Sequence, residues 1–337
     1  MAAQIPVYRH PTMTVLIDDD RTSLVTLQYQ IDTSLATTTF NRARNALAWI
    51  VECFNKVVQL GDASASRVDA QSEAIVAVGG ADEALEQIYH YVGKPERFLL
   101  PTVVVIDYSM PDMDGLEFCV AAHDLPCKKI LFTAQADDKT AIDGFNRGLI
   151  NKFIRKQDPD ALDRLEAAID VLQADYFLER SRAVAARLDV RDFGFLSDAV
   201  VANLVRKLRD TYGFVEHYLF AYPTGLLFFD AGGHATLLVI QTQDSLDAHV
   251  KAALAHGATT EDVAPLTDGR AVPFFHSTDG MWNAQLPGQL GEYIKAAQRC
   301  LGDEDYLWAL FELPLHYQKS MPYSHAQFLR EHIAARA

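Results

Sequence analysis

Residues 103–115 read VVVIDYSMPDMDG and predict the architecture of the N-terminal half. Four β-branched residues form a strand that ends at Asp107, and Pro111 and Gly115 indicate a turn before the next helix. Open parallel α/β sheets bind their ligands at the carboxyl ends of their strands. We therefore expect the carboxylate of Asp107 to lie exposed at a strand end, where it is available for chemistry.

Three further apolar segments end in polar residues, in the order that such a sheet requires. Because the carboxyl ends of parallel strands share one edge, an acid cluster, Asp107, a hydroxyl group and a lysine are predicted to converge there. The segments are residues 14–20 (TVLIDDD, ending in Asp18, Asp19 and Asp20), residues 130–134 (ILFTA, with Thr133) and residues 151–156 (NKFIRK, ending in Lys156).

The chemistry of this edge follows from its charges. Neighbouring carboxylates repel one another, so they either retain a proton or recruit a divalent cation. A site made only of oxygen atoms suits Mg²⁺. The cation would shield Asp107 from an approaching phosphoryl group, while Lys156 and Thr133 could each hold a phosphoryl oxygen. Asp107 is then expected to act as the nucleophile and to form an aspartyl phosphate.

This pattern resembles the receiver domain of two-component response regulators over residues 12–172. The resemblance implies a CheY-like α/β domain, with a five-stranded, parallel, doubly wound sheet in the order 2-1-3-4-5. It also implies a sensor histidine kinase or a phosphotransfer protein as the phosphoryl donor. The only enzymatic activities expected are self-phosphorylation and autodephosphorylation.

The resemblance also assigns roles to individual residues. Asp107 is the phosphoacceptor, Thr133 and Lys156 assist the transfer, and Phe153 is the aromatic residue that switches rotamer. Asp19, Asp107 and the backbone carbonyl of Ser109 are implied ligands of Mg²⁺, and Asp18 acts on the ion through a water molecule.

The acid cluster and Asp107 are separated by more residues than is usual in this family. Residues 73–92, EAIVAVGGADEALEQIYHYV, predict the second strand and helix, so a helical insertion is expected at about 36–70. Within it, residues 40–60 place apolar side chains at helical intervals. Two interpretations stay open: an extended first helix packed on the receiver, or a surface for dimerisation or for the partner kinase.

The end of the receiver carries a second helical pattern, and residues 173–195 are predicted to be a helical linker. Apolar residues recur there at steps of three and four residues and form a seam. Two interpretations stay open: the seam packs the last receiver helix on its own sheet, or the helix continues beyond the receiver and transmits the signal through a dimer. The seam consists of Leu162, Leu165, Ile169, Leu172 and Tyr176.

Residues 196–337 are predicted to be an α+β output domain. We expect helices at 197–212, capped by Ser197, at 244–257 and at 288–301, and strands at 215–229 and 235–242. No run typical of a diguanylate cyclase, a metal phosphohydrolase or a Walker loop occurs there. The half is therefore predicted to be a non-enzymatic interaction domain, and an unrecognised output enzyme is the alternative.

Charge argues against nucleic acid as a partner. The chain of 337 residues has a formal net charge of −15, and both halves are acidic, unlike the electrostatic footprint of nucleic-acid binding proteins. The alternative is a transcriptional regulator that uses a basic cluster of Arg206, Lys207 and Arg209. No apolar run approaches the length of a membrane span, and the four scattered cysteines suit a reducing compartment, so a cytoplasmic location is expected.

The chain as a whole is similar to quorum-sensing response regulators of the Legionella type, through the phrase FNRGLINKFIRK and the long insertion. This similarity implies a nuclease-like output fold. Residues 176–337 contain no acid followed two residues later by lysine, so nuclease chemistry is not expected.

Overall fold

The computed structural model describes residues 4–61, 92, 94–134, 144–186, 188, 190–275, 280–283, 285–286, 288–313 and 322–334. The chain divides into two compact units. One consists of Met1–Arg9 and Ala185–Ala326, and the other of His10–Val184 and Gln327–Ala337. We call the first the antiparallel unit and the second the parallel unit, after the main sheet in each.

The parallel unit contains a five-stranded sheet in the order β3-β2-β4-β5-β6. All four pairings are parallel, and in chain order the arrangement is 2-1-3-4-5, so the predicted sheet is confirmed. Its strands are β2 (Met13–Ile17), β3 (Thr37–Phe40), β4 (Pro101–Ile106), β5 (Lys128–Thr133) and β6 (Lys152–Arg155).

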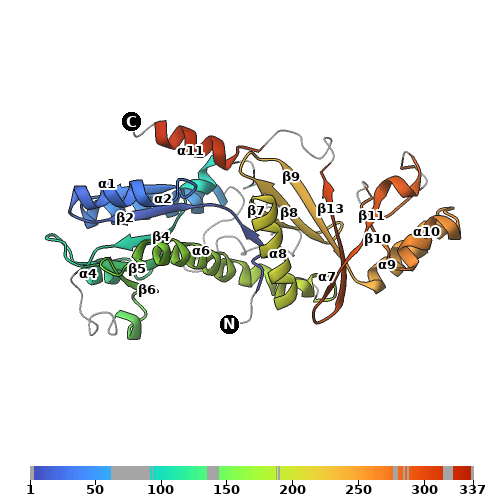
Figure 1. The fold of residues 1–337 in the computed structure, drawn as a ribbon, viewed down its shortest axis with the longest axis horizontal. Coiled ribbons are helices and arrows are strands. Elements are labelled where there is room, and N and C mark those ends of the chain that lie inside the picture. Colours follow the sequence, from blue (N-terminus) through green and yellow to red (C-terminus); the bar gives the residue numbers. More distant parts are fainter. Residues whose placement is uncertain are drawn as a thin grey trace. The chain divides into compact units, whose positions relative to one another are not determined.

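Helices cover both faces of this sheet, as Figure 1 shows. Successive strand residues point to opposite faces, so Val15 joins an apolar cluster with α2 (Ala43–Gly61) and α4 (Gly115–Ala121). Leu16 joins a second cluster with α1 (Arg21–Gln30) and α6 (Ala161–Ala185). The central strands are buried on both faces, which explains why they read as continuous apolar runs.

The second strand of the sheet lies earlier in the chain than predicted. It is β3, Thr37–Phe40, which pairs with β2 along its whole length, and α2 follows it. The insertion expected at about 36–70 is therefore wrong, because Thr37–Phe40 and Ala43–Gly61 supply a strand and a helix of the parallel unit itself. The strand and helix predicted at 73–92 lie almost entirely outside the described residues. The sequence TTTF has no long apolar run because β3 is an edge strand with half-buried side chains. Residues 62–91 lie outside the described residues.

Helix α6 is one continuous helix of 25 residues. Its first half packs on the parallel sheet through Leu165, Ile169 and Leu172, and Tyr176 and Phe177 are also buried. The seam therefore packs the helix on its own sheet, and the helix also continues to Ala185.

The two units differ in extent from the domains expected at 12–172, 173–195 and 196–337. Strand β1 (Tyr8–Arg9) pairs with β7 in the antiparallel sheet. Most of helix α11 (His325–Ala334) belongs to the parallel unit, where the ring centroid of Phe328 lies 5.3 Å from that of Phe98. Strand β1, near the N-terminus, thus belongs to the antiparallel unit, and most of helix α11, near the C-terminus, belongs to the parallel unit.

The antiparallel unit is an α+β fold, as predicted, built on a six-stranded sheet in the order β1-β7-β8-β9-β13-β12. Helix α8 (Ala199–Tyr212) packs against β7 and β12, and α9 (Gln243–Ala255) packs against α10 (Thr260–Thr267). A small second sheet pairs β10 (Ala271–Pro273) with β11 (Ile294–Ala296). The other strands are β7 (Phe214–Phe220), β8 (Gly225–Asp230), β9 (Ala235–Gln241), β12 (Gln298–Leu301) and β13 (Asp305–Glu312).

Three expectations for this unit are wrong in detail. The strand expected at 215–229 is two strands, β7 and β8. The helix expected at 288–301 is a short 3₁₀ turn (Leu290–Tyr293) followed by β11 and β12, because strand pairing overrides the helix propensity of its alanines. Helix α8 is capped by Asp198 instead of Ser197: the carboxylate accepts hydrogen bonds from Val200 N at 2.7 Å and Val201 N at 3.1 Å.

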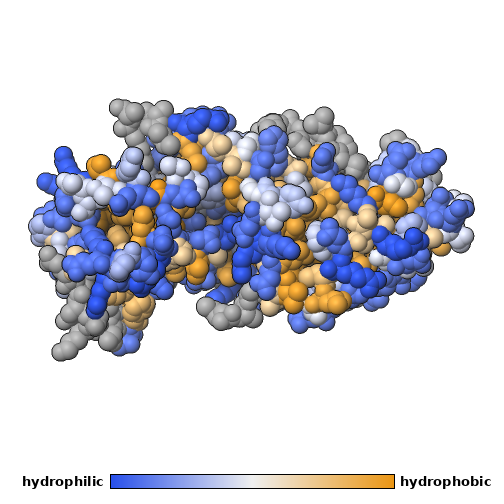
Figure 2. Space-filling view, viewed as in Figure 1, coloured by the Kyte–Doolittle hydropathy of each residue, from blue (hydrophilic) through white to orange (hydrophobic). Residues whose placement is uncertain are grey.

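Hydrophilic residues cover much of the molecular face drawn in Figure 2, and hydrophobic residues are scattered among them. Within the part of the chain that the structure describes, no helix has both the length and the apolar character that a membrane crossing requires.

Candidate functional site

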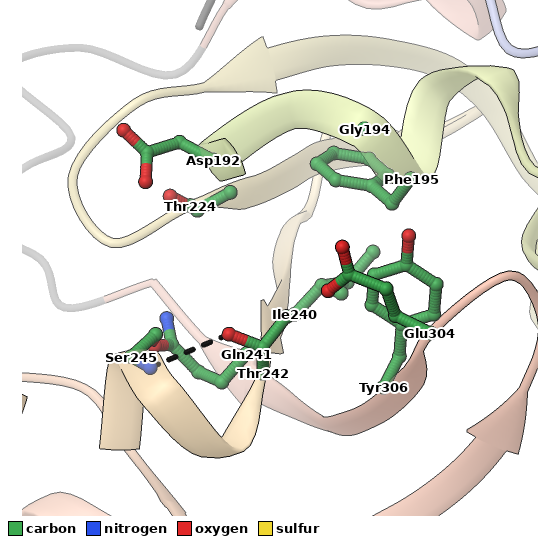
Figure 3. Close-up of a pocket in the computed structure, with 10 residues that line it drawn as sticks. All are labelled: Asp192, Gly194, Phe195, Thr224, Ile240, Gln241, Thr242, Ser245, Glu304 and Tyr306. Atoms are coloured by element: carbon green, nitrogen blue, oxygen red, sulfur yellow. Dashed lines mark hydrogen bonds between the residues drawn. The ribbon is translucent and has the colours of Figure 1, made fainter. Parts of the chain in front are cut away.

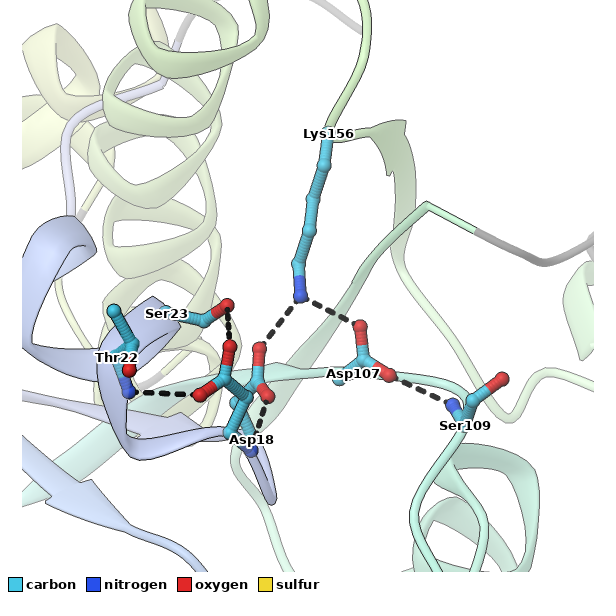
Figure 4. Close-up of polar contacts among 7 residues, drawn as sticks. Asp18, Thr22, Ser23, Asp107, Ser109 and Lys156 are labelled. Carbon is cyan, nitrogen blue, oxygen red and sulfur yellow. Dashed lines mark hydrogen bonds and ion pairs between the residues drawn. The ribbon is translucent and has the colours of Figure 1, made fainter.

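Lys156 joins two of the predicted strand-end carboxylates at one edge of the parallel sheet. Its ammonium nitrogen Nζ donates to Asp18 Oδ2 at 2.6 Å and to Asp107 Oδ1 at 2.7 Å (Figure 4). The three residues follow β2, β4 and β6 directly, so the parallel sheet brings them together. The predicted convergence of an acid, Asp107 and a lysine is thus present in the structure.

The backbone holds both carboxylates in place. Asp107 Oδ2 accepts a hydrogen bond from Ser109 N at 2.7 Å, and Asp18 Oδ1 accepts one from Asp20 N at 2.9 Å. The amide of Asp107 donates to the carbonyl of Ile17 at 2.9 Å, which ties the ends of β4 and β2 to each other. Each carboxylate therefore faces Lys156 with one oxygen and the backbone with the other.

Asp107 is more enclosed than the sequence suggested, because only 8% of its surface is exposed. The turn after β4 folds back closely on it: a Cβ atom at Gly115 would lie 2.6 Å from the backbone oxygen of Asp107. Glycine is therefore required at the start of α4, where the capping box of Asp114 and Glu117 fixes the helix.

The three consecutive aspartates have different surroundings. Asp18 is buried and contacts Lys156, whereas Asp19 is exposed. Asp20 caps α1 by accepting hydrogen bonds from Thr22 N at 2.9 Å and Ser23 Oγ at 3.0 Å, and these bonds lower the pKa of its carboxyl group. Sequence reasoning missed this capping role, although an aspartate before a helical stretch is its usual signal.

Thr133 and Phe153 lie close to the Lys156 segment along the sheet. Thr133 is buried at the end of β5, and its carbonyl accepts a hydrogen bond from Lys156 N at 3.0 Å. Phe153 is half-buried on β6, in register with Leu131, and packs against the apolar cluster under α2 and α4. Both residues are therefore coupled to the segment that carries the lysine.

Lys156 remains protonated in this setting. Burial lowers its pKa, but hydrogen bonds and charge from Asp107 and Asp18 outweigh burial, and the net shift is upward. The lysine is thus a fixed positive charge beside Asp107.

The donor atoms at this edge suit a hard divalent cation. All the side-chain donors are carboxylate oxygens, which Mg²⁺ prefers. In their ionised forms Asp18, Asp19 and Asp107 carry three negative charges against the single positive charge of Lys156, which leaves an excess of two. Within the described residues, no three acid, histidine or cysteine side chains are already grouped as a metal site.

The basic cluster considered for nucleic-acid binding lies in the antiparallel unit and is not part of this sheet edge. Arg206, Lys207 and Arg209 are on α8 of the antiparallel unit, where the first two are exposed and Arg206 contacts Asn203. Ser109 is adjacent to Asp107 through its amide, as described above.

A search of solved structures finds a close match over almost the whole chain. The response regulator LqsR of Legionella pneumophila is 30% identical, with a TM-score of 0.77, and the match covers 98% of this chain and 97% of LqsR. The chain therefore belongs to the response regulator family, and its parallel unit is a CheY-like receiver domain. The resemblance found in the sequence is confirmed.

Isolated receiver domains match about half of the chain. The signal receiver domain of a putative Luxo repressor protein from Vibrio parahaemolyticus is 17% identical, with a TM-score of 0.33, over 50% of this chain and 95% of its own. A CheY-like receiver domain from Methanospirillum hungatei JF-1 is 16% identical, with a TM-score of 0.29, over 49% and 98%. No family model matches the sequence, and no curated protein does.

Proposed function

We propose that this response regulator accepts a phosphoryl group on Asp107 from a sensor histidine kinase or a phosphotransfer protein, and relays the signal to a non-enzymatic output domain in the antiparallel unit. The main support is the bridge from Lys156 to Asp107 and Asp18. The lysine supplies one cation at the position where phosphoryl charge would develop, and the backbone already orients the Asp107 carboxylate.

The transfer balances without any further reactant. A carboxylate oxygen of Asp107 bonds to phosphorus as the phosphorus–nitrogen bond of the donor phosphohistidine breaks, and the released imidazole takes up a proton. Lys156 then exchanges its contact with Asp107 for one with a phosphoryl oxygen, and Thr133 holds another. Phe153 responds through its packing beside Leu131, because its strand is continuous with the Lys156 segment.

Mg²⁺ is the cofactor in this proposal. Asp19, Asp107 and the backbone carbonyl of Ser109 would hold it, and Asp18 would act through a water molecule. When bound, the ion neutralises the excess negative charge and shields Asp107 from the incoming phosphoryl oxygens.

Phosphorylation by a small-molecule donor tests the proposal. Purified full-length chain incubated with acetyl phosphate and Mg²⁺ is expected to gain one phosphoryl group, seen as a shifted band on a phosphate-affinity gel. EDTA and the Asp107→Asn substitution each abolish the shift, whereas Asp124→Asn, which removes an exposed carboxylate of the same unit, retains it. An equal shift in Asp107→Asn and Asp124→Asn would refute the assignment.

A further inference from the structure

The antiparallel unit contains a small pocket to which no role has been assigned (Figure 3). Its lining comes from α7 (Val190–Phe193), the following 3₁₀ turn (Gly194–Ser197), the β7–β8 turn, the end of β9, the start of α9 and the β12–β13 hairpin. Two carboxylates, several hydroxyl groups and one amide line it, and none of the lining residues carries a positive charge.

Tyr306 points an unsatisfied hydrogen-bonding group into this pocket. Only 5% of its surface is exposed, and Figure 3 shows the hydroxyl beside the carboxylate of Glu304 on the pocket wall. Within the described part of the chain this hydroxyl has no hydrogen-bonding partner. The hydroxyl opens onto the pocket, so a ligand bound there is the partner to which it could donate. Burial, and then the negative charge of Glu304, raise its pKa to about 12, so the hydroxyl keeps its proton and can donate.

The carboxylates of the pocket are also unpaired. Asp192 and Glu304 lie on opposite sides of it in Figure 3, and neither forms an ion pair with any residue that the structure describes. Other exposed acids of the same unit do: Asp268 pairs with Arg270 at 2.7 Å and Asp305 with Arg299 at 3.2 Å. The pocket therefore concentrates negative charge without a compensating cation.

The remaining wall is fixed and partly aromatic. Gln241 is 4% exposed, and its amide oxygen accepts a hydrogen bond from the hydroxyl of Ser245. Phe195 is buried and presents its ring to the pocket. Carboxylates and an aromatic ring are the groups that bind ammonium ions in proteins.

We propose that this pocket binds a small organic ammonium ion that also carries a hydroxyl or carbonyl oxygen. The ammonium group donates to Glu304 and Asp192, and the ligand oxygen accepts from the hydroxyl of Tyr306. An anion is excluded by the charge of the lining, and a purely apolar ligand would leave the Tyr306 hydroxyl and both carboxylates without partners. The site would let the output domain respond to a metabolite independently of Asp107.

Calorimetric titration of the full-length chain with ethanolamine, and separately with choline, tests this site. Saturable binding of at least one probe at low ionic strength is expected. Glu304→Gln should weaken it by about tenfold, and Tyr306→Phe by severalfold, because one removes the charge and the other the donor. Glu312→Gln removes an exposed carboxylate of the same strand as Tyr306 and should leave the affinity unchanged.

The controls separate this proposal from the phosphorylation site. Asp107→Asn should bind the probe as tightly as the natural chain does. Ethylene glycol and glycolate, which lack the positive charge, should bind at least tenfold more weakly than ethanolamine. Absence of saturable binding with both ammonium probes, equal affinity in Glu304→Gln and Glu312→Gln, or stronger binding of glycolate would each overturn the proposal.

Discussion

The parallel and antiparallel units place their polar side chains by different rules. In the parallel unit, the strand ends of β2, β4 and β6 deliver Asp18, Asp107 and Lys156 to one sheet edge. In the antiparallel unit, the pocket is assembled from two helices, two turns, the end of β9 and a hairpin, and no single strand pattern connects these segments. A parallel sheet brings the carboxyl ends of its strands, and the polar residues that follow them, to one edge. In an antiparallel sheet, the loops and helices around the sheet determine which polar side chains meet.

The stability of the two units is also expected to depend on different interactions. Polar contacts support the receiver edge, and close backbone packing supports the antiparallel sheet. Substitutions that remove one or the other should therefore show which force holds each unit.

Gly225→Ala should have the largest effect. A Cβ atom there would overlap the backbone carbonyl of Leu238 on the neighbouring strand, and no side-chain rotation relieves that. We expect a loss of at least about 3 kcal/mol in the free energy of unfolding, measured by urea denaturation with the fluorescence of Trp308 in the same sheet. Gly291→Ala, which has open space around it, should change stability by less than about 0.5 kcal/mol. Equal stability of the two variants would contradict the close packing of β8 on β9.

Lys156→Met should destabilise the parallel unit by about 2–3 kcal/mol in EDTA, because two enclosed carboxylates would face each other without their shared cation. Lys152→Met removes an exposed lysine from β6, the strand that directly precedes Lys156, and should have almost no effect. Chemical denaturation of both variants measures the difference. The bridge would be unimportant for stability if the two unfolding curves coincided.

Acid should weaken the antiparallel unit through His249. Burial lowers the pKa of this histidine from 6.5 to about 4, so its contribution is fully present above pH 6.5 and is lost as the pH falls toward 4. Between pH 7 and pH 5 the natural chain should lose about 2 kcal/mol of stability from this group. His249→Leu should abolish that part of the pH dependence, while His123→Gln, at an exposed site of the parallel unit, should retain it. Unchanged pH dependence in His249→Leu would show that the histidine is not buried in this way.

Asp20→Ala should have the smallest effect. It removes the cap of α1 and should lower the melting temperature only slightly, while phosphorylation of Asp107 continues. Asp20→Ser should recover most of that stability because serine also caps helices. Thermal unfolding and the phosphate-affinity gel measure the two quantities. Loss of phosphorylation in Asp20→Ser would mean that Asp20 belongs to the reactive edge and not only to the helix cap.

The sequence predicted the sheet order and the meeting of Asp18, Asp107 and Lys156, because buried parallel strands leave long apolar runs with polar ends. It did not locate β3, since an edge strand reading TTTF carries no such signal. It also missed the return of β1 and α11 to the other unit, because nothing local marks a partner hundreds of residues away. Tyr306 could not be recognised either, since its unsatisfied hydroxyl is visible only once the strands around it are paired.

The central claim is that phosphorylation takes place on Asp107, and chemical trapping tests it most directly. After treatment with acetyl phosphate and Mg²⁺, reduction with borohydride converts a phosphoaspartate into homoserine, which peptide mass spectrometry can locate. We predict homoserine at position 107, and its absence when Mg²⁺ is removed. Homoserine at another aspartate, or none at position 107 in a chain that has taken up phosphate, would contradict the account.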